Sequence, residues 1–319
     1  MNSQLLIENL SNPALLFFLL GIIAVQLKSD LEIPESTSKF ISMYLLFSIG
    51  FKGGQELAHS HLDTTVLWGI VFGIIIAIVI PLYAFFILKK RFSIANAGAV
   101  AAAYGSVSAV TFVTAVAFLD TMNLKFGGHM VAVMALMEAP AIVVGVLLIH
   151  FFDKERNRTG LFKVTMKHAF TNGSVLLIVG SLCIGWIASD TQAQGIKPFT
   201  TDIFKGFLAI FLLDMGIASG RKLPEFYKNG WFAFFFALLM PLVNGSLVAF
   251  ASHWITAIPG DRFIFAVLAA SASYIAVPAA MRIVVPEANP GLLLPMTLAI
   301  TFPFNITFGM PLYLYIIQS

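Results

Sequence analysis

Residues 101–111 read AAAYGSVSAVT and residues 269–277 read AASASYIAV, and both stretches lie inside otherwise apolar segments. The first combines a glycine with the hydroxyl groups of two serines and a closing threonine, Thr111. The second is followed by Pro278, which removes a backbone donor and disfavours helical geometry at the residue before it. Each stretch therefore predicts a helix that is interrupted near its middle.

The whole sequence is too apolar for a soluble protein. Of its 319 residues, 59% are hydrophobic and 11% are charged, whereas about 25% of a soluble domain is charged. The mean hydropathy is +0.90. The net charge of +3 is too small to indicate a nucleic-acid partner. This composition predicts an all-α integral membrane protein in contact with the lipid bilayer.

Ten segments are apolar enough to be spanning helices, which need about 20 residues each. Cytoplasmic loops carry more Lys and Arg than outer loops, so basic residues indicate orientation. Of the 19 basic residues, 14 lie in or beside odd-numbered loops and five in or beside even-numbered ones. This predicts a multi-pass protein of the plasma membrane (in a bacterium, the inner membrane), with both termini outside the cytoplasm. The expected spans are 13–27, 37–51, 64–88, 94–119, 129–152, 172–189, 199–219, 230–254, 263–285 and 291–317.

The order of features suggests that the chain repeats itself at an offset of about 160 residues. Residues 48–54 resemble 214–220, and a proline-containing helix and an interrupted segment follow in each case. We expect a first five-helix repeat at 1–152, a cytoplasmic linker at 153–171 and a second repeat at 172–319. Five spans per repeat is an odd number, so the second repeat enters the membrane inverted, as in many secondary transporters. The GxxxG spacings Gly50/Gly54 and Gly216/Gly220 indicate helix-packing faces.

The two interruptions are the expected site. Irregular backbone at membrane depth must line a cavity or be buried in protein. The N-termini of half-helices suit an anion, and the hydroxyl and carbonyl oxygens beside them suit a sodium ion. The alternative is that the small residues only allow close helix packing.

Glu138 is a second indication, because a carboxylate inside an apolar helix is costly unless it has a partner or a function. In the second repeat its place is taken by about Thr301, with Asn305 one turn further on. We expect the sodium ligands to come from a set of oxygen-bearing side chains: Ser108, Thr111, Glu138, Thr301 and Asn305.

Known enzymatic signatures are not found. The sequence contains no GxxxxGK[ST] loop, no HExxH and no GxSxG, so it indicates neither an ATP-driven pump nor an intramembrane hydrolase. The single cysteine, Cys183, excludes a cysteine-based metal cluster. We expect no enzyme activity, and no cofactor or metal other than Na⁺ as a coupling ion.

Several motifs together resemble the sodium-dependent bicarbonate transporter family best known from cyanobacteria. They are IPES at 33–36, SIGFKGG at 48–54, YGSVSAVT at 104–111, MEAP at 137–140, and SASYIAVPAAMR with PEANP between 271 and 290. The resemblance implies ten spans in two inverted repeats, with interrupted helices 4 and 9 crossing at the midplane. It also implies a gate domain and a mobile core domain, each built from both repeats, an elevator-type movement, a homotrimer and coupling to sodium. The substrate-binding residues carried over are Gly105, Ser106, Val107, Ser108, Ser271, Ser273, Tyr274 and Ile275.

The chain departs from the family pattern in two places. Where the cyanobacterial members have Ser-Ser-Ser-Asp-Ile-Ser-Gly-Pro-Pro, residues 271–279 have Tyr274 in place of the acid and alanines in place of hydroxyls. The linker at 153–171 is also shorter, so regulation by a PII-like partner is not expected.

Three functions follow from these observations. The first is sodium-coupled symport of bicarbonate. The second is sodium-coupled symport of another small organic anion, which Tyr274 favours. The third is a passive channel, which the confinement of polar residues to the two interruptions disfavours. Dependence of uptake on a sodium gradient separates the symporters from the channel.

Overall fold

The computed structural model describes residues 12–59, 64–153, 173–226 and 230–319. Every regular element in these ranges is a helix. The expected linker at 153–171 lies almost wholly outside the described residues. The first half of the chain contains α2 (Pro13–Gln26), α3 (Glu35–Ala58), α4 (Thr64–Leu88), α5 (Ile94–Gly105), α6 (Ala109–Thr121) and α7 (His129–Phe152).

The second half contains more numerous and shorter elements, several of them π-helical turns. These are α9 (Gly173–Ile187), α10 (Asp190–Lys197), η1 (Pro198–Asp202), α11 (Phe204–Phe226), α12 (Gly230–Ala251), η3 (Ser252–Trp254), α13 (Pro259–Ala270), α14 (Ala276–Val284), α15 (Pro290–Leu294), η4 (Pro295–Thr301), α16 (Phe302–Phe304), η5 (Asn305–Gly309) and α17 (Met310–Gln318).

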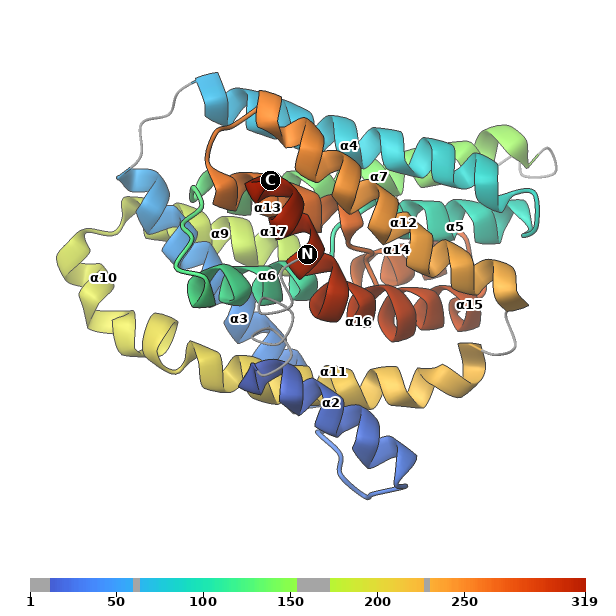
Figure 1. Ribbon diagram of the computed structural model, residues 1–319, viewed down its shortest axis with the longest axis horizontal. Helices are drawn as coiled ribbons and strands as arrows, with labels where there is room; N and C mark the ends of the chain where they lie inside the picture. Colours follow the sequence, from blue (N-terminus) through green and yellow to red (C-terminus); the bar gives the residue numbers. More distant parts are fainter. Residues whose placement is uncertain (1–11, 60–63, 154–172, 227–229) are drawn as a thin grey trace.

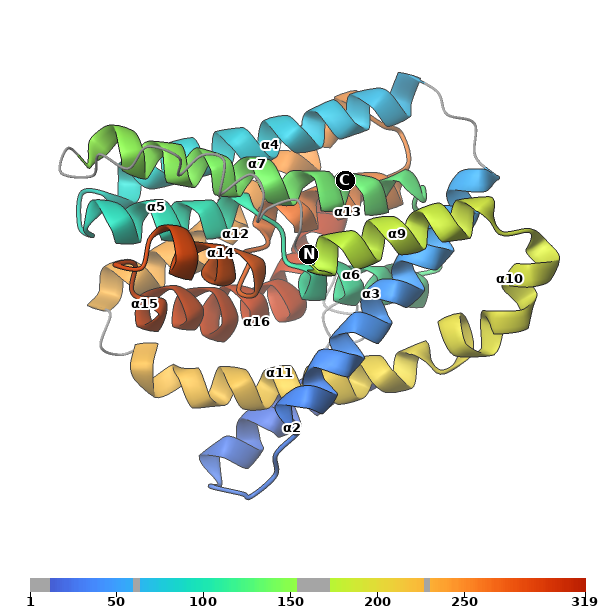
Figure 2. The ribbon, with the colours of Figure 1, turned by 180° about the vertical axis from the view of Figure 1, so that it is seen from behind.

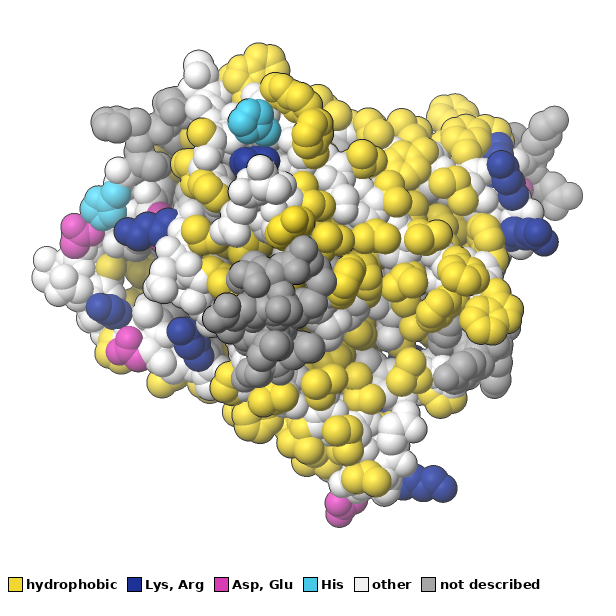
Figure 3. Space-filling model, viewed as in Figure 1, with side chains coloured by type: hydrophobic (Ala, Val, Ile, Leu, Met, Phe, Trp, Pro, Cys, Tyr) yellow, Lys and Arg dark blue, Asp and Glu magenta, His cyan; other side chains and the backbone are white. Residues whose placement is uncertain are grey.

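Six helical stretches in the described residues are long and apolar enough to cross a membrane, and two shorter apolar helices accompany them. The structure thus agrees with a multi-pass membrane protein, while the count of ten spans stays a prediction. The expected spans 64–88 and 129–152 coincide with α4 and α7. Figure 3 shows hydrophobic side chains over the middle of one face, with most of its Lys and Arg toward the ends of the long axis.

The helices form two groups (Figures 1 and 2). In one group α2 packs along α11 and α3 packs along α9. In the other, α4, α5 and α7 pack together, and α12 packs on α13 and α17. The first group touches the second mainly where α11 meets η4 and where α3 meets α6 and α7.

Glycines allow the helix pairs of the first group to approach closely. A Cβ added at Gly54 would overlap the Leu182 carbonyl of α9, and one at Gly216 would overlap the Phe18 carbonyl of α2. The prediction that these GxxxG faces serve packing is confirmed. A rigid, glycine-lined contact of this kind needs no large apolar side chains, which suits association inside lipid.

Both expected interruptions are present. Helix α5 ends at Gly105 and α6 begins at Ala109, with Ser106 in extended backbone between them. Helix α13 ends at Ala270 and α14 begins at Ala276, with Ser271 likewise extended. Each long span is therefore two half-helices joined by a short extended link.

Prolines in the neighbouring helices shape this region. Pro81 of α4 packs against Gly105, where a Cβ would overlap the proline ring. Pro241 of α12 has no N–H to donate to the carbonyl four residues earlier, that of Ala237. The Thr301 hydroxyl donates to that carbonyl instead, at 2.7 Å. The carbonyl that Pro241 leaves without a backbone donor in α12 thus accepts a hydrogen bond from a side chain of η4.

Candidate functional site

The two interruptions are joined by hydrogen bonds. The Ser273 amide donates to the Ala103 carbonyl at 2.9 Å, and this bond joins the second interruption to the last turn of α5. The Ser108 amide donates to Ser271 Oγ at 3.0 Å, and that hydroxyl in turn donates to the Leu268 carbonyl at 2.8 Å. The structure therefore brings the predicted substrate-binding segments of both halves into direct contact.

A small cavity of about 30 Å³ lies at this crossing. It has room for one or two water-sized guests. Two elements supply most of its wall, the link before α6 and the link before α14, and α3 and α7 complete it. The lining residues are Ser42, Leu46, Val107, Ser108, Ala109, Val110, Met134, Glu138, Ser273, Tyr274, Ile275 and Ala276.

Five of the eight predicted substrate-binding residues line this cavity: Val107, Ser108, Ser273, Tyr274 and Ile275. Ser271 lies beside it and holds Ser108 in place. The hydroxyls of Ser108 and Ser273 sit at the N-termini of α6 and α14, where they accept from the amides of Thr111 at 3.1 Å and Val277 at 3.3 Å. Free N–H groups and the positive helix ends gather there, and both favour a negatively charged guest.

Gly105 and Ser106 lie just behind the cavity wall. Ser106 is fully buried, and among the described side chains its Oγ is one of the few buried polar atoms without a hydrogen-bond partner. Leaving a hydroxyl unpaired in the interior costs free energy, so such a group calls for an explanation. A ligand or a rearranged state of the cavity would supply the missing partner.

Glu138 projects from α7 into the same cavity, one helical turn after Met134. Its side chain is nearly buried, with 6% of the residue exposed. It is the single carboxylate among the cavity-lining residues. Together with the Ser108 hydroxyl, it gives the cavity hard oxygen atoms of the kind that a sodium ion prefers.

The other predicted sodium ligands do not line the cavity. Thr111 is buried one turn into α6. The Thr301 hydroxyl is bonded to Tyr104 Oη at 2.7 Å as well as to the Ala237 carbonyl. Asn305 donates from Nδ2 to the Ala270 carbonyl at 2.8 Å and accepts from Tyr313 Oη at 3.1 Å. In this structure Asn305 braces the second interruption, while Thr301 joins α5, next to the first interruption, to α12. The role of both side chains as sodium ligands stays a prediction.

Tyr274 occupies the position of the acid in the related pattern. Its ring packs edge-on against Phe302 at 6.1 Å between centroids, and its hydroxyl approaches Met215 Sδ at 3.5 Å. Met215 belongs to α11, so this side chain connects the second interruption with the first group of helices. The tyrosine thus brings bulk and a neutral hydroxyl to a place where a carboxylate would bring charge.

A much larger cavity of about 910 Å³ adjoins the site. It lies between α3, α9 and α11, and Ser42 and Ile275 line both cavities. Further along α3, the seam with α7 is tight: a Cβ at Gly128 would overlap the Gly53 carbonyl. The small cavity therefore adjoins the large cavity at Ser42 and Ile275, while α3 and the start of α7 are in close contact at Gly53.

Six cavity residues were not predicted from the sequence. Ala109, Val110 and Ala276 directly follow predicted residues in the chain, whereas Ser42, Leu46 and Met134 come from α3 and α7. Met134 carried a usable signal, because residues four apart share a helix face and Glu138 lies four residues on. Ser42 and Leu46 belong to a face of α3 that contains residues 35, 38, 42, 46, 49, 53 and 56, which are spaced three and four apart. Along α3 this face contributes to the large cavity, then to the site, then to the tight seam.

Two interrupted helices that meet around a polar cavity, in a chain with several membrane-crossing helices, define a class: polytopic membrane proteins with the site architecture of secondary transporters. A comparison with known protein families identifies the group within that class. The sequence profile of the Na⁺-dependent bicarbonate transporter superfamily matches residues 13–318, and the chain belongs to this superfamily. No curated protein matches the sequence.

Proposed function

We propose that the protein is a secondary active transporter that carries bicarbonate together with Na⁺ by an elevator-type movement. The single observation that supports this most is the cavity at the helix crossing, which combines helix N-termini and serine hydroxyls with one carboxylate. The helix N-termini and serine hydroxyls suit an anion, and the carboxylate suits a cation. Membership of the Na⁺-dependent bicarbonate transporter superfamily supplies the identity of both ions.

The roles follow from the contacts. The hydroxyls of Ser108 and Ser273, with the N-termini of α6 and α14, bind the anion. Ser271 orients Ser108, and the unpaired hydroxyl of Ser106 becomes available as a donor when the cavity is occupied. Glu138 binds the sodium ion with Ser108 and Thr111, and Thr301 and Asn305 are the further candidate ligands.

The charge of Glu138 explains why the two ions would travel together. A carboxylate and a bound anion about 5 Å apart repel each other by roughly 3 kcal/mol at an effective dielectric constant of about 20. A sodium ion between them turns this repulsion into two attractions. Bicarbonate then binds well only when sodium is present, and this dependence is the coupling that a symporter needs.

The arrangement of cavities supports alternating access. The site adjoins the large cavity at Ser42 and Ile275, and α3 packs tightly on the start of α7 at Gly53. The face of α3 from Glu35 to Glu56 covers 21 residue steps, or about 32 Å at 1.5 Å per residue. That length matches the hydrocarbon core of a bilayer. We propose that the second group of helices, which contains both interruptions, is the mobile core domain. It moves along this face of the first group (α2, α3, α9 and α11), which is the gate domain.

The proposal includes the repeats and the assembly. The paired contacts of α2 with α11 and of α3 with α9 are what two inverted repeats would produce, because each pair joins an early helix of one half to a later helix of the other. The homotrimer, the position of both termini outside the cytoplasm, and the absence of a PII-like regulator are carried over as proposals from the sequence.

A sodium-coupled symporter of another small organic anion is the second candidate. Tyr274 favours it, because an aromatic ring can contact the carbon skeleton of a carboxylic acid. The small volume of about 30 Å³ disfavours the larger organic anions. A passive channel is disfavoured, because polar residues inside the apolar segments are concentrated at the two interruptions.

Uptake of labelled bicarbonate into proteoliposomes, with and without an inward sodium gradient at fixed pH, tests the proposal. We expect accumulation with the sodium gradient and none with an equal potassium gradient. Protein-free liposomes are the control for passive entry of carbon dioxide. Sodium-dependent uptake of small carboxylates without uptake of bicarbonate would favour the second candidate, and uptake that ignores the sodium gradient would contradict both symporters.

A further inference from the structure

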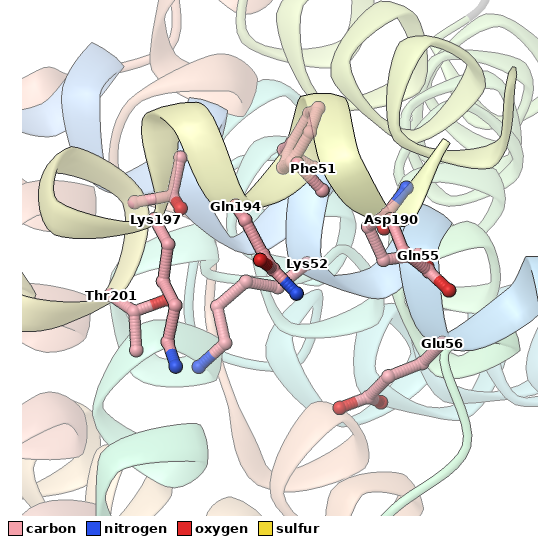
Figure 4. Close-up of a pocket in the computed structure, with 10 residues that line it drawn as sticks. Phe51, Lys52, Gln55, Glu56, Asp190, Gln194, Lys197 and Thr201 are labelled. Atoms are coloured by element: carbon pink, nitrogen blue, oxygen red, sulfur yellow. The ribbon is translucent and has the colours of Figure 1, made fainter. Parts of the chain in front are cut away.

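A third cavity, of about 370 Å³, lies at the opposite end of α3 from the large cavity. It is formed between the end of α3 and the α10–η1 segment. The loop charges place this end outside the cytoplasm. Figure 4 shows the side chains of Lys52 and Lys197 extending to the same side of the pocket, with their ammonium groups next to each other in that view. The pocket is lined by Phe51, Lys52, Gln55, Glu56, Asp190, Ala193, Gln194, Lys197, Thr200 and Thr201.

The acidic groups of this pocket have partners of their own. Asp190 accepts from His59 at 2.9 Å, on the side away from the two lysines. Glu56 is attracted by Lys52 and also by Lys125 from outside the pocket. Within the described residues, neither Lys52 nor Lys197 forms an ion pair at 4 Å or less.

The neutral groups divide between structure and recognition. The Gln55 amide is committed, because Nε2 donates to the carbonyls of Gly185 and Ala188 and thereby fixes α3 against the end of α9. Gln194 and Thr201 extend into the pocket beside the lysines. Two ammonium groups in one pocket repel each other, and an oxyanion bound between them would remove that repulsion while accepting hydrogen bonds from both.

The pocket leads toward the site. Lys52 and Glu56 also line a smaller cavity of about 40 Å³ between α3 and α6, where Asp120 and Phe126 form part of the wall. Ile49 and Gly53 continue this wall along the same face of α3 that carries Ser42 at the helix crossing. An anion held by the two lysines is thus at the outer end of the proposed translocation face.

We propose that Lys52 and Lys197 form a recruitment site for small oxyanions of the carbonate and carboxylate class, separate from the site at the helix crossing. The two ammonium groups hold the anion at the outer end of the seam by charge-assisted hydrogen bonds. Recruitment for transport rests on the proposed function, whereas binding of the anion in this pocket does not.

Protection of lysines from acetylation tests binding directly. The full-length protein in nanodiscs of phosphatidylcholine is treated with an acetylating reagent in bicarbonate or in chloride of equal ionic strength, and the modified lysines are quantified by mass spectrometry. We expect bicarbonate to slow modification of Lys52 and Lys197 by about twofold to fivefold, the effect typical of exposed charge pairs. Lys205 is exposed, lies outside the pocket and is the internal control. In Lys197→Gln, the protection of Lys52 should be lost.

The proposal would be overturned if Lys52 and Lys197, like Lys205, were modified at the same rate in bicarbonate as in chloride. Nanodiscs containing phosphatidylglycerol separate the sources of the anion: protection that needs this lipid and is indifferent to bicarbonate would show that a lipid headgroup occupies the pocket, and would overturn recruitment of a free anion. In the uptake assay, Lys52→Gln with Lys197→Gln should raise the half-saturating bicarbonate concentration and leave the maximal rate unchanged, whereas Lys205→Gln should change neither.

Failure of the recruitment site and failure of the proposed function give different results. Protection of the lysines in a protein that takes up no bicarbonate would leave the pocket standing and remove the proposed function. Sodium-dependent uptake without protection of the lysines, and with an unchanged half-saturating bicarbonate concentration in the double variant, would support the proposed function and remove the recruitment site.

Discussion

Replacing Thr301 by valine tests whether this side chain joins α5, next to the first interruption, to α12. Valine keeps the shape of threonine and removes the hydroxyl, which donates to the Ala237 carbonyl and is bonded to Tyr104 Oη, each at 2.7 Å. Three segments lose a common contact: α12, α5 and η4. Pro241 has no N–H with which to satisfy the Ala237 carbonyl again, so that acceptor stays unpaired.

The magnitude follows from the two lost hydrogen bonds. Hydrogen bonds between membrane helices contribute about 0.6 kcal/mol on average and up to about 1.7 kcal/mol. We therefore expect the free energy of unfolding to fall by about 1–3 kcal/mol in Thr301→Val. Thr297→Val is the matched control, because the Thr297 hydroxyl is equally buried but donates only to Leu293 and Leu294 in its own helical segment.

The assay is equilibrium unfolding by sodium dodecyl sulfate in mixed micelles, followed by tryptophan fluorescence. Thr301→Val should lose more stability than Thr297→Val, and Thr301→Ser, which keeps the hydroxyl, should lose less than Thr301→Val. The reasoning would be refuted if Thr301→Val matched the Thr297 control in stability. A shift in the sodium activation of uptake at unchanged stability would instead support the prediction that Thr301 is a sodium ligand.

Three further predictions concern the site and its frame. Ser106→Ala with Ser273→Ala should abolish transport, and uptake and membrane insertion are measured together. The stability cost should be at most about 2 kcal/mol, because the Ser106 hydroxyl has no hydrogen bond to lose and Ser273 loses one cap hydrogen bond. Glu138→Gln should raise the sodium concentration needed for half-maximal uptake, because the cavity loses its carboxylate. Gly54→Leu should separate α3 from α9, because even a Cβ would overlap the Leu182 carbonyl, and should lower the yield of folded protein in detergent.

Each of these predictions has a result that contradicts it. Normal uptake by the double serine variant would remove the site assignment. An unchanged sodium activation curve in Glu138→Gln would leave that carboxylate with a structural role. Gly206→Leu is the control for Gly54→Leu, because a Cβ at Gly206 meets nothing within 4 Å, and equal yields of the two variants would contradict the packing argument.

The interruptions and the class of the protein were predictable from sequence, because glycine, serine and proline in an apolar segment have few structural explanations. The bounds of α4 and α7 were also predictable, since these helices are uniformly apolar. The cavity was predictable only in part. Ser108, Ser273 and Glu138 stand out as polar residues in apolar surroundings, whereas Leu46 and Met134 look like any other residues of a core.

Other features could not be read from sequence, because they depend on which helices become neighbours. The engagement of Thr301 with the Ala237 carbonyl depends on η4 packing beside Pro241, a contact across 64 residues. The presence of Lys52 and Lys197 in one pocket depends likewise on the α10–η1 segment, whose η1 part packs against α3. The loop charges predict both lysines on one side of the membrane, and the tertiary structure shows them lining one pocket.

The bond between the Ser273 amide and the Ala103 carbonyl has an evolutionary consequence. Both partners belong to the main chain, so any residue other than proline at position 273 supplies the same donor. Mutation can therefore exchange the side chains that surround the guest while the crossing of the two segments persists. The resemblance noted in the sequence implies that Tyr274 is one such exchange, and a lineage built on this frame can acquire a new cargo without a new fold.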